Sequence, residues 1–235
     1  MLNSIKWEEM NTSLITPNMK ILNGLTSREK KIAGFYAVGV LALGLFTAYV
    51  HFFFSSFDKQ LIDILHQDRG KTFAAMMDFI SWWGMNMNMV WPVFAVGVLF
   101  FIASYKREAW LALTVFIADS VNILLKLAIN RSRPQQMDVY PKFQQASFPS
   151  GHVVHYVVFF GFILTVLLVN PKIPKIVRWL GGALCVFLIA GVSVARIYLG
   201  THWPSDILAA YVLGFVMLGI LILFYIKSRQ ASKVL

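Results

Sequence analysis

The amino-acid sequence predicts an all-α fold, a polytopic membrane bundle of six transmembrane helices in one domain. Of its 235 residues, 58% are hydrophobic and only 14% are charged, and the mean hydropathy is +0.66. Charged residues usually make up about a quarter of a soluble domain. Apolar runs of about 20 residues, the length needed to cross the hydrocarbon core, recur along the chain. A soluble protein with a large apolar core is therefore a poor interpretation.

Six spans follow from these runs, and polar segments flank them. The first run is too long for a signal peptide and lacks a small-residue cleavage site. Residues 1–31 are the predicted N-terminal segment, residues 32–226 the membrane domain and residues 227–235 the C-terminal tail. The six predicted spans are residues 32–54, 87–104, 109–129, 152–170, 176–198 and 205–226.

The longest connection, residues 56–85, has an amphipathic pattern of its own. Phe57, Leu61 and Leu65 recur at helical spacing among polar residues, and two tryptophans stand side by side at 82 and 83. Amphipathic helices with tryptophan are typical of the membrane–water interface. We therefore expect an interfacial helical segment between the first two spans, either as a wall at which lipid enters or as packing over the bundle.

The distribution of Lys and Arg predicts how the chain is oriented. Thirteen of the 21 basic residues fall on the side of the N-terminus and eight on the other side. Cytoplasmic loops carry the excess of positive charge, so both termini are expected in the cytoplasm. The net charge of +10 is scattered over short loops instead of forming one stripe, which argues against a nucleic-acid partner. The single cysteine, Cys185, excludes a disulfide within the chain.

Three polar clusters, remote in the sequence, fall on the predicted outer side. One closes the third span, one opens the fourth, and one joins the fifth and sixth spans. Six-span topology brings all three to a single membrane face, and this convergence is the main functional signal. The clusters are Lys126-x6-Arg133-Pro134, Pro149-Ser150-Gly151-His152 and Arg196-x5-His202-x3-Asp206.

The cations of these clusters predict a phosphate site. Lys126, Arg133 and Arg196 would repel one another at a membrane edge, and charge that is partly buried there is costly and usually functional. Arginine presents a planar fork that matches phosphate oxygens, while lysine acts as a point charge. Snorkelling to lipid headgroups explains one such residue, but not three that converge with two histidines.

The start of the fourth span has the features of an anion-binding helix terminus. Ser150 is a good N-cap, and Gly151 allows a ligand to approach the backbone closely. Free N–H groups and a partial positive charge at a helix N-terminus bind phosphate. Taken alone, the same residues are equally consistent with a simple helix cap.

The two histidines suggest phosphoryl chemistry. Pro204 is favoured at the first helical position, so Asp206 is expected in the first turn of the sixth span. Its carboxylate would accept the Nδ1–H of His202 and leave Nε2 free as a nucleophile. His152 would then donate a proton to the leaving group.

A metal site is the rival interpretation. His152, His155, His202 and Asp206 offer three nitrogens and an oxygen. Three cations at the same place would oppose a dication, however, so we expect no metal and no cofactor.

Together the three clusters resemble the signature motifs of the type 2 phosphatidic acid phosphatase superfamily. That family includes membrane lipid phosphatases, undecaprenyl pyrophosphate phosphatases, soluble acid phosphatases and vanadium haloperoxidases. The resemblance covers about residues 109–226 and is specific, because all three motifs occur in order and at the right faces. It implies a phosphatase that works without a metal.

The resemblance also assigns roles to individual residues. Phosphate binding falls to the cations and the helix start, and catalysis to the two imidazoles and the carboxylate. One position departs from the family: Ala195 stands where serine is common, so a hydroxyl contact to phosphate is missing. The implied phosphate-binding residues are Lys126, Arg133, Ser150, Gly151 and Arg196, and the catalytic residues are His202 as nucleophile, Asp206 as its orienting group and His152 as general acid.

Other polar residues near the motifs receive plainer interpretations. Asp119 and Asn122 share a helical face with Lys126. We expect Asp119 to satisfy interior polar groups, and tuning of Lys126 through a network is the alternative. His155 is expected to pack inward or to support the site without reacting. The polar residues of the loop between the first two motifs are expected to be solvated, although contact with a headgroup is the alternative. They are Arg131, Asp138, Lys142 and Gln144.

The resulting hypothesis is a lipid phosphatase of the plasma (inner) membrane with its active site on the extracytoplasmic side. The candidate substrates are undecaprenyl pyrophosphate, placed first, then phosphatidylglycerol phosphate, phosphatidic acid and lipid A 1-phosphate. A phosphotransferase that passes the phosphoryl group from His202 to another lipid is the alternative. A lipid-binding or transport protein without catalysis is the third possibility, but a mere binder needs no nucleophile. No obligate protein partner is inferred.

Overall fold

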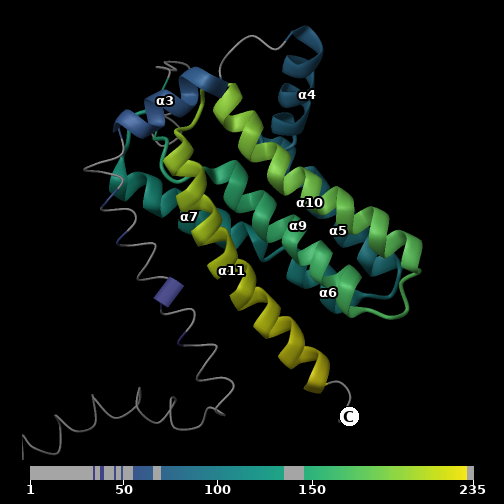
Figure 1. Ribbon diagram of the computed structural model, residues 1–235. Helices are drawn as coiled ribbons and strands as arrows, with labels where there is room; N and C mark the ends of the chain where they lie inside the picture. Colours follow the sequence, from purple (N-terminus) through teal and green to yellow (C-terminus); the bar gives the residue numbers. More distant parts are fainter. Residues whose placement is uncertain are drawn as a thin grey trace, which may run out of the picture. The chain divides into compact units, whose positions relative to one another are not determined.

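The protein is helical throughout the part that its computed structural model describes, which comprises residues 55–65, 70–134 and 146–231 and isolated positions between 34 and 49. No strand occurs within these residues, so the predicted all-α class is confirmed. The predicted first span, residues 32–54, lies outside the continuously described part. The elements in Figure 1 are α3 (Ser55–Leu65), α4 (Lys71–Trp82), η1 (Asn86–Met89), α5 (Val90–Ile102), α6 (Lys106–Ala112), α7 (Val115–Ile129), α9 (Gly151–Val169), α10 (Lys175–Tyr198) and α11 (Pro204–Ala231).

Four helical segments among the described residues are long and apolar enough to cross a membrane. They match the third to sixth predicted spans to within a few residues. The first of them combines α6 and α7, which are separated by a turn where the hydroxyl of Thr114 donates to the carbonyl of Leu111 (2.6 Å). The segments are Lys106–Ile129, Gly151–Val169, Lys175–Tyr198 and Pro204–Arg229. The protein is therefore a membrane protein.

Residues 71–102, which precede these four segments, differ from the prediction. The sequence predicted an interfacial segment followed by one complete span. At 13 residues, α5 is about 20 Å long and too short to cross the membrane alone. Helix α4 and residues 87–102 pass as a single span only when taken together, with a bend of 72° between them. Met77 and Ile80 of α4 are buried, and α4 packs against α10. Helix α4 therefore belongs to the bundle, and a total of six spans remains a prediction.

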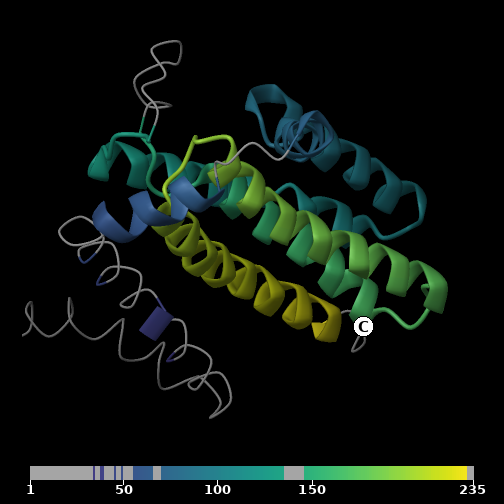
Figure 2. The ribbon, with the colours of Figure 1, turned by 45° about the horizontal axis from the view of Figure 1, so that its top comes forward.

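Helix α9 is the centre of the bundle. It packs against α7, α10 and α11, and α10 and α11 flank it in both ribbon views (Figures 1 and 2). Within its membrane-spanning window 61% of the residues are buried, against 28–44% for the other three spans. Because α9 begins at Gly151, the second polar cluster is surrounded by the ends of its neighbours.

Two glycines allow α9 and α11 to approach closely. A methyl group on Gly161 of α9 would lie 2.5 Å from Cδ2 of Leu218, and one on Gly214 of α11 would lie 2.8 Å from Cβ of Val157. Small residues at helix crossings bring backbones together and increase van der Waals contact, which drives helix association in lipid. The crossing therefore depends on both glycines.

We predict that Gly214→Ala destabilises the protein by about 1–3 kcal/mol, because the backbone fixes Cβ of Val157 and it cannot rotate away. Gly161→Ala should cost less, since the far end of Leu218 is flexible. Thermal unfolding in detergent measures both variants. Gly97→Ala is the matched control, because its methyl group would meet only the carbonyl of Ala109 at 3.8 Å. Equal unfolding midpoints for Gly214→Ala and Gly97→Ala would contradict the prediction.

Candidate active site

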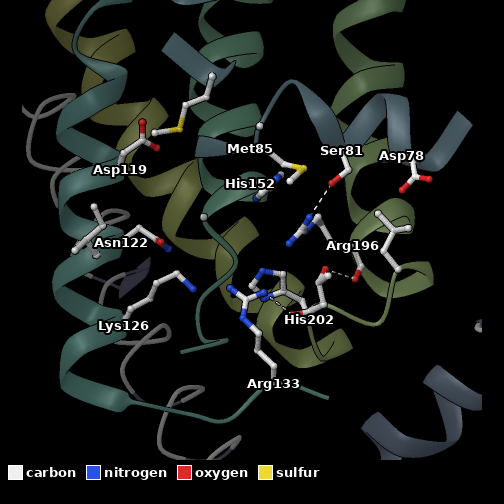
Figure 3. Close-up of a pocket in the computed structure, with 16 residues that line it drawn as sticks. Asp78, Ser81, Met85, Asp119, Asn122, Lys126, Arg133, His152, Arg196 and His202 are labelled. Atoms are coloured by element: carbon white, nitrogen blue, oxygen red, sulfur yellow. Dashed lines mark hydrogen bonds between the residues drawn. The ribbon is translucent and has the colours of Figure 1, made fainter. Parts of the chain in front are cut away.

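The structure brings residues of all three polar clusters together around one cavity of about 360 Å³. Figure 3 shows Lys126, Arg133 and Arg196 directed toward the space around His202. These residues come from the end of α7, the segment after it, the end of α10 and the turn before α11. The predicted site residues that line the cavity are Lys126, Arg133, Gly151, His152, Arg196 and His202.

Lys126 is held in place by backbone carbonyls. Its Nζ donates hydrogen bonds to the carbonyl oxygens of Ala146 (2.8 Å) and Ser147 (3.3 Å), which belong to the segment that leads into α9. One turn earlier on α7, the amide of Asn122 donates to the carbonyl of Pro149 (3.3 Å). These contacts join the end of α7 to the start of α9. Asn122 thus satisfies a backbone carbonyl in the interior.

The two arginines also bond to uncharged oxygens. Nη1 of Arg133 donates to the carbonyl of Thr201 (2.9 Å), and Nη1 of Arg196 donates to the hydroxyl of Ser81 (2.7 Å). Ser81 lies in α4, so this helix also contributes to the site. Hydrogen bonds to neutral oxygens help to orient a guanidinium. The lining contains three cations, together with Asp78 and Asp119, and the cations favour an anionic ligand.

The start of α9 is arranged as expected, but Ser150 and Gly151 have different surroundings from those predicted. Ser150 is the N-cap residue, yet its hydroxyl makes no cap hydrogen bond and is buried without a partner among the described residues. It is not among the residues that line the cavity. A methyl group on Gly151 would lie 3.1 Å from Oδ1 of Asn122, so close packing against α7 explains this glycine. Gly151 and His152 line the cavity at the helix terminus, where unpaired N–H groups are found.

His152 is enclosed by a turn that the sequence analysis did not single out. Its Nε2 is buried and has no hydrogen-bond partner among the described residues. A methyl group on Gly84, in the turn after α4, would lie 2.5 Å from Cδ2 of His152. The hydroxyl of Tyr156, one turn along α9, donates to the carbonyl of Ile80 (2.5 Å) and holds α4 in place. The imidazole therefore fits only because residue 84 has no side chain.

His202 and Asp206 form the expected pair at the start of α11. Nδ1 of His202 lies 3.5 Å from Oδ2 of Asp206, and that oxygen accepts a hydrogen bond from the backbone N–H of Trp203 (2.9 Å). At 3.5 Å this contact is an electrostatic pairing and not a hydrogen bond, and Nδ1 of His202 has no hydrogen-bond partner among the described residues. Asp206 lies in the first turn of α11, as predicted.

Burial and positive charge keep His202 neutral. Its side chain is 2% exposed, and burial is the main cause that lowers its pKa well below 6.5. The positive charges of Arg196, Lys126 and Arg133 lower the pKa further. A neutral imidazole at neutral pH has a lone pair available for attack on phosphorus.

The expectation that Arg131 is a solvated loop residue is wrong. Its side chain is only 15% exposed and forms ion pairs with Asp58 of α3 and Asp206 of α11, both at 2.7 Å. Periodicity does not reveal this burial, because the residue follows the helix end at Ile129. The other polar residues named for this loop, at 138, 142 and 144, lie outside the described residues.

The remaining predicted residues occupy the interior around the cavity. His155 is 2% exposed, and its Nδ1 lies 2.9 Å from Oδ2 of Asp119, which lines the cavity. The pair agrees with the supporting role expected for His155. In the described part of the chain, no group of three or more His, Cys, Asp or Glu side chains is arranged to hold a metal, and metal independence stays a prediction. Ala195 is buried in the hydrophobic core and does not line the cavity.

Comparison with known proteins identifies the family. Residues 107–230 match the PAP2 superfamily, the type 2 phosphatidic acid phosphatases. The chain belongs to the PAP2 superfamily. It is 30% identical over 168 residues to the undecaprenyl-diphosphatase of Sulfolobus acidocaldarius, a match that covers 67% of this chain and 73% of that protein. The resemblance seen in the three motifs is thus confirmed.

Two further matches extend the relation to other PAP2 proteins. Phosphatidylglycerophosphatase B of Bacillus subtilis is 33% identical over 134 residues, 53% of this chain and 60% of that protein. The crystal structure described as the first transmembrane PAP2 type phosphatidylglycerolphosphate phosphatase from Bacillus subtilis has the same fold. Its TM-score is 0.72 at 22% identity, with 82% of this chain and 96% of that chain covered. These matches support a membrane phosphatase.

We predict that Gly84→Ala lowers the rate of lipid-phosphate hydrolysis about tenfold or more, because the added methyl group displaces the imidazole of His152 and small displacements at a reacting centre are costly. The measurement is kcat in detergent, with thermal unfolding to verify the fold. Gly97→Ala, whose methyl group has room, is again the matched control. A folded Gly84→Ala variant with unchanged kcat would show that the turn does not constrain the imidazole.

Proposed function

We propose that the protein hydrolyses a lipid phosphate or diphosphate through a phosphohistidine intermediate on His202, without a metal. The observation that carries the proposal is the single cavity lined by three cations and two imidazoles. A tetrahedral phosphoryl group is the ligand that such a cavity best complements, because its oxygens match both the arginine forks and the N–H groups of a helix terminus. The phosphate would be bound by Lys126, Arg133 and Arg196 and by the start of α9, where Gly151 lines the cavity and Ser150 is the N-cap residue behind it.

In the first chemical step, Nε2 of His202 attacks phosphorus and a P–N bond forms. The bond from phosphorus to the leaving oxygen breaks, and His152 gives that oxygen a proton. The ring of the phosphohistidine carries a positive charge, which the carboxylate of Asp206 beside Nδ1 stabilises. The cations stabilise negative charge on the equatorial oxygens in the transition state.

In the second step, water attacks the phosphorus of the phosphohistidine. His152 accepts the proton of the water, the P–N bond breaks and inorganic phosphate is released. A diphosphate substrate thus gives the lipid monophosphate and inorganic phosphate, and a monophosphate substrate gives the lipid alcohol and inorganic phosphate. Both histidines return to their starting states. The buried Nε2 of His152, which has no partner in the described part of the chain, supports its role as the group that carries this proton.

The proposed substrate is a polyprenyl diphosphate, ahead of phosphatidylglycerol phosphate, phosphatidic acid and lipid A 1-phosphate. The undecaprenyl-diphosphatase match, which spans the larger share of this chain, supports that order. The proposed site is on the extracytoplasmic side of the plasma membrane, with both termini in the cytoplasm. The excess of Lys and Arg on the other side supports this orientation.

We predict that the purified protein, mixed with a polyprenyl diphosphate labelled on its terminal phosphorus, forms a labelled protein that survives an alkaline quench. Phosphohistidine is stable to alkali and labile to acid, so acid should release the label. His202→Ala should form no labelled protein and lose turnover by several orders of magnitude, about 10⁴-fold or more, because the nucleophile is absent. The measurement is gel autoradiography with parallel release of inorganic phosphate.

Three additions to this experiment separate the alternatives. Label that ends on a second lipid instead of inorganic phosphate would identify a phosphotransferase, and turnover abolished by EDTA would overturn the metal-free mechanism. Faster labelling by phosphatidylglycerol phosphate than by the diphosphate would reverse the substrate order. Full activity in His202→Ala would exclude this residue as the nucleophile.

We predict that the acidic limb of the kcat/KM profile contributed by His202 lies below pH 6.5, because its lowered pKa keeps the imidazole neutral there. Replacing one of the cations that lower this pKa, as in Arg196→Gln, should raise the pKa and move the limb to higher pH. The comparison uses one substrate for both proteins, so ionisation of the phosphate itself cancels. A limb that stays in place or moves to lower pH in Arg196→Gln would contradict this account.

A further inference from the structure

A buried network of charges lies behind the cavity wall, where three separate parts of the chain meet. The guanidinium of Arg131 donates from Nη1 to Oδ1 of Asp206 (2.7 Å) and from Nη2 to Oδ2 of Asp58 (2.7 Å). Both carboxylates have no exposed surface, and the guanidinium side chain is 15% exposed. None of the three residues is among those that line the cavity. Any effect on the reaction must therefore pass through another side chain.

The network engages both oxygens of the Asp206 carboxylate. Arg131 holds Oδ1, and the backbone N–H of Trp203 holds Oδ2, the oxygen that lies 3.5 Å from Nδ1 of His202. The guanidinium also lies over the ring of Trp203, 5.5 Å from its centroid. With both oxygens engaged, the carboxylate cannot rotate away from the imidazole without losing a charge-assisted hydrogen bond.

Asp58 connects α3 to the start of α11. Its Oδ1 accepts a hydrogen bond from the backbone N–H of Ser205 (3.0 Å), and its Oδ2 accepts one from the hydroxyl of Ser205 (2.6 Å). That hydroxyl also accepts a bond from Nη1 of Arg131 (2.7 Å). Helix α11 begins at Pro204, so this N–H is one of those that the helix itself leaves unpaired. A carboxylate at a helix N-terminus is also favoured by the helix dipole.

Helix α3 therefore contributes to the network around Asp206, although it lies outside the part of the chain that matches the family. The family match covers residues 107–230, whereas Asp58 precedes it by almost 50 residues. Helix α3 packs against both α10 and α11, and Figure 2 shows it across the beginning of α11. Two buried carboxylates that lie close together need a shared cation. The planar fork of an arginine can bond to both of them, whereas a lysine bonds well to only one.

We propose that Arg131 and Asp58 are positioning residues for the phosphatase reaction: they hold Asp206 against Nδ1 of His202, so that Nε2 stays directed at phosphorus. This inference rests on the proposed function of His202. It makes α3 a part of the catalytic apparatus, with Asp58 acting through Arg131 and Arg131 acting through Asp206.

The test measures kcat, KM and the rate of phosphohistidine formation for the full chain in detergent, with the labelled polyprenyl diphosphate. Asp58→Asn and Arg131→Gln should each lower kcat and phosphohistidine formation about tenfold to hundredfold, the loss typical of groups that orient a catalytic residue. KM should stay unchanged, because the phosphate-binding cations are intact. Arg131→Lys should recover part of the rate, since it keeps the charge but loses the fork.

A double variant tests the order of action. If Asp58 acts through Arg131, then Asp58→Asn combined with Arg131→Gln should be no slower than Arg131→Gln alone. A purely structural role for Asp58 would instead give losses that multiply. Ser205→Ala keeps every charge and removes only the shared hydroxyl, so it reports on the network even where a charge variant fails to fold. It should lower kcat less than Asp58→Asn does, again without a change in KM.

Matched controls separate local from general effects. Asp63→Asn makes the same change at an exposed position of α3, and Arg178→Gln removes an arginine at the opposite end of α10 from Arg196; both should keep the wild-type kcat. Wild-type kcat in folded Asp58→Asn and Arg131→Gln, or a higher KM at unchanged kcat, would overturn the inference. A wild-type protein that forms no phosphohistidine would overturn the proposed function instead, so the two failures are distinguishable.

Discussion

The mutual repulsion of Lys126, Arg133 and Arg196 is the constraint on which the rest of the site depends. Three cations around one cavity, in a chain that crosses a membrane, are unfavourable unless something holds them or an anion joins them. Each of them donates a hydrogen bond to an uncharged oxygen. In chain order, the acceptors are the carbonyl of Ala146, the carbonyl of Thr201 and the hydroxyl of Ser81. Such acceptors help to fix the positions of the cations around the cavity. Burial lowers the pKa of His202 most, and the positive charges of these residues lower it further.

Two buried carboxylates lie behind the cavity wall, whereas Asp78 and Asp119 line the cavity itself. Asp58 and Asp206 share Arg131, so the guanidinium offsets their negative charge behind the wall. If either carboxylate faced the cavity, it would compete with the phosphoryl group for the cations. The two arginines of this segment therefore differ in role. Arg131 pairs with the carboxylates behind the wall, whereas Arg133 lines the cavity.

Prediction from sequence was most accurate where local pattern and topology suffice. The apolar runs give the spans from Lys106 onward to within a few residues, because a helix in lipid must satisfy all of its own backbone groups over a fixed thickness. The convergence of Lys126, His152 and His202 follows from the same rule, since alternating spans return the chain to one face. Prediction was weaker before residue 87, where α4 is too short to span alone and packs against α10 instead.

By itself, the sequence determined the fold class, the family and the residues of the three motifs, since each depends on residue types at fixed spacing. Only the tertiary structure decided that Arg131 is buried and that Asp58 pairs with it. It also decided that His152 leaves no room for a side chain at Gly84 and that Gly151 packs tightly against Asn122. Those facts depend on contacts between helices that are remote in the chain. Neither periodicity nor spacing encodes them, because the same charged residue or glycine in a loop is compatible with solvent until a neighbouring helix is packed against it.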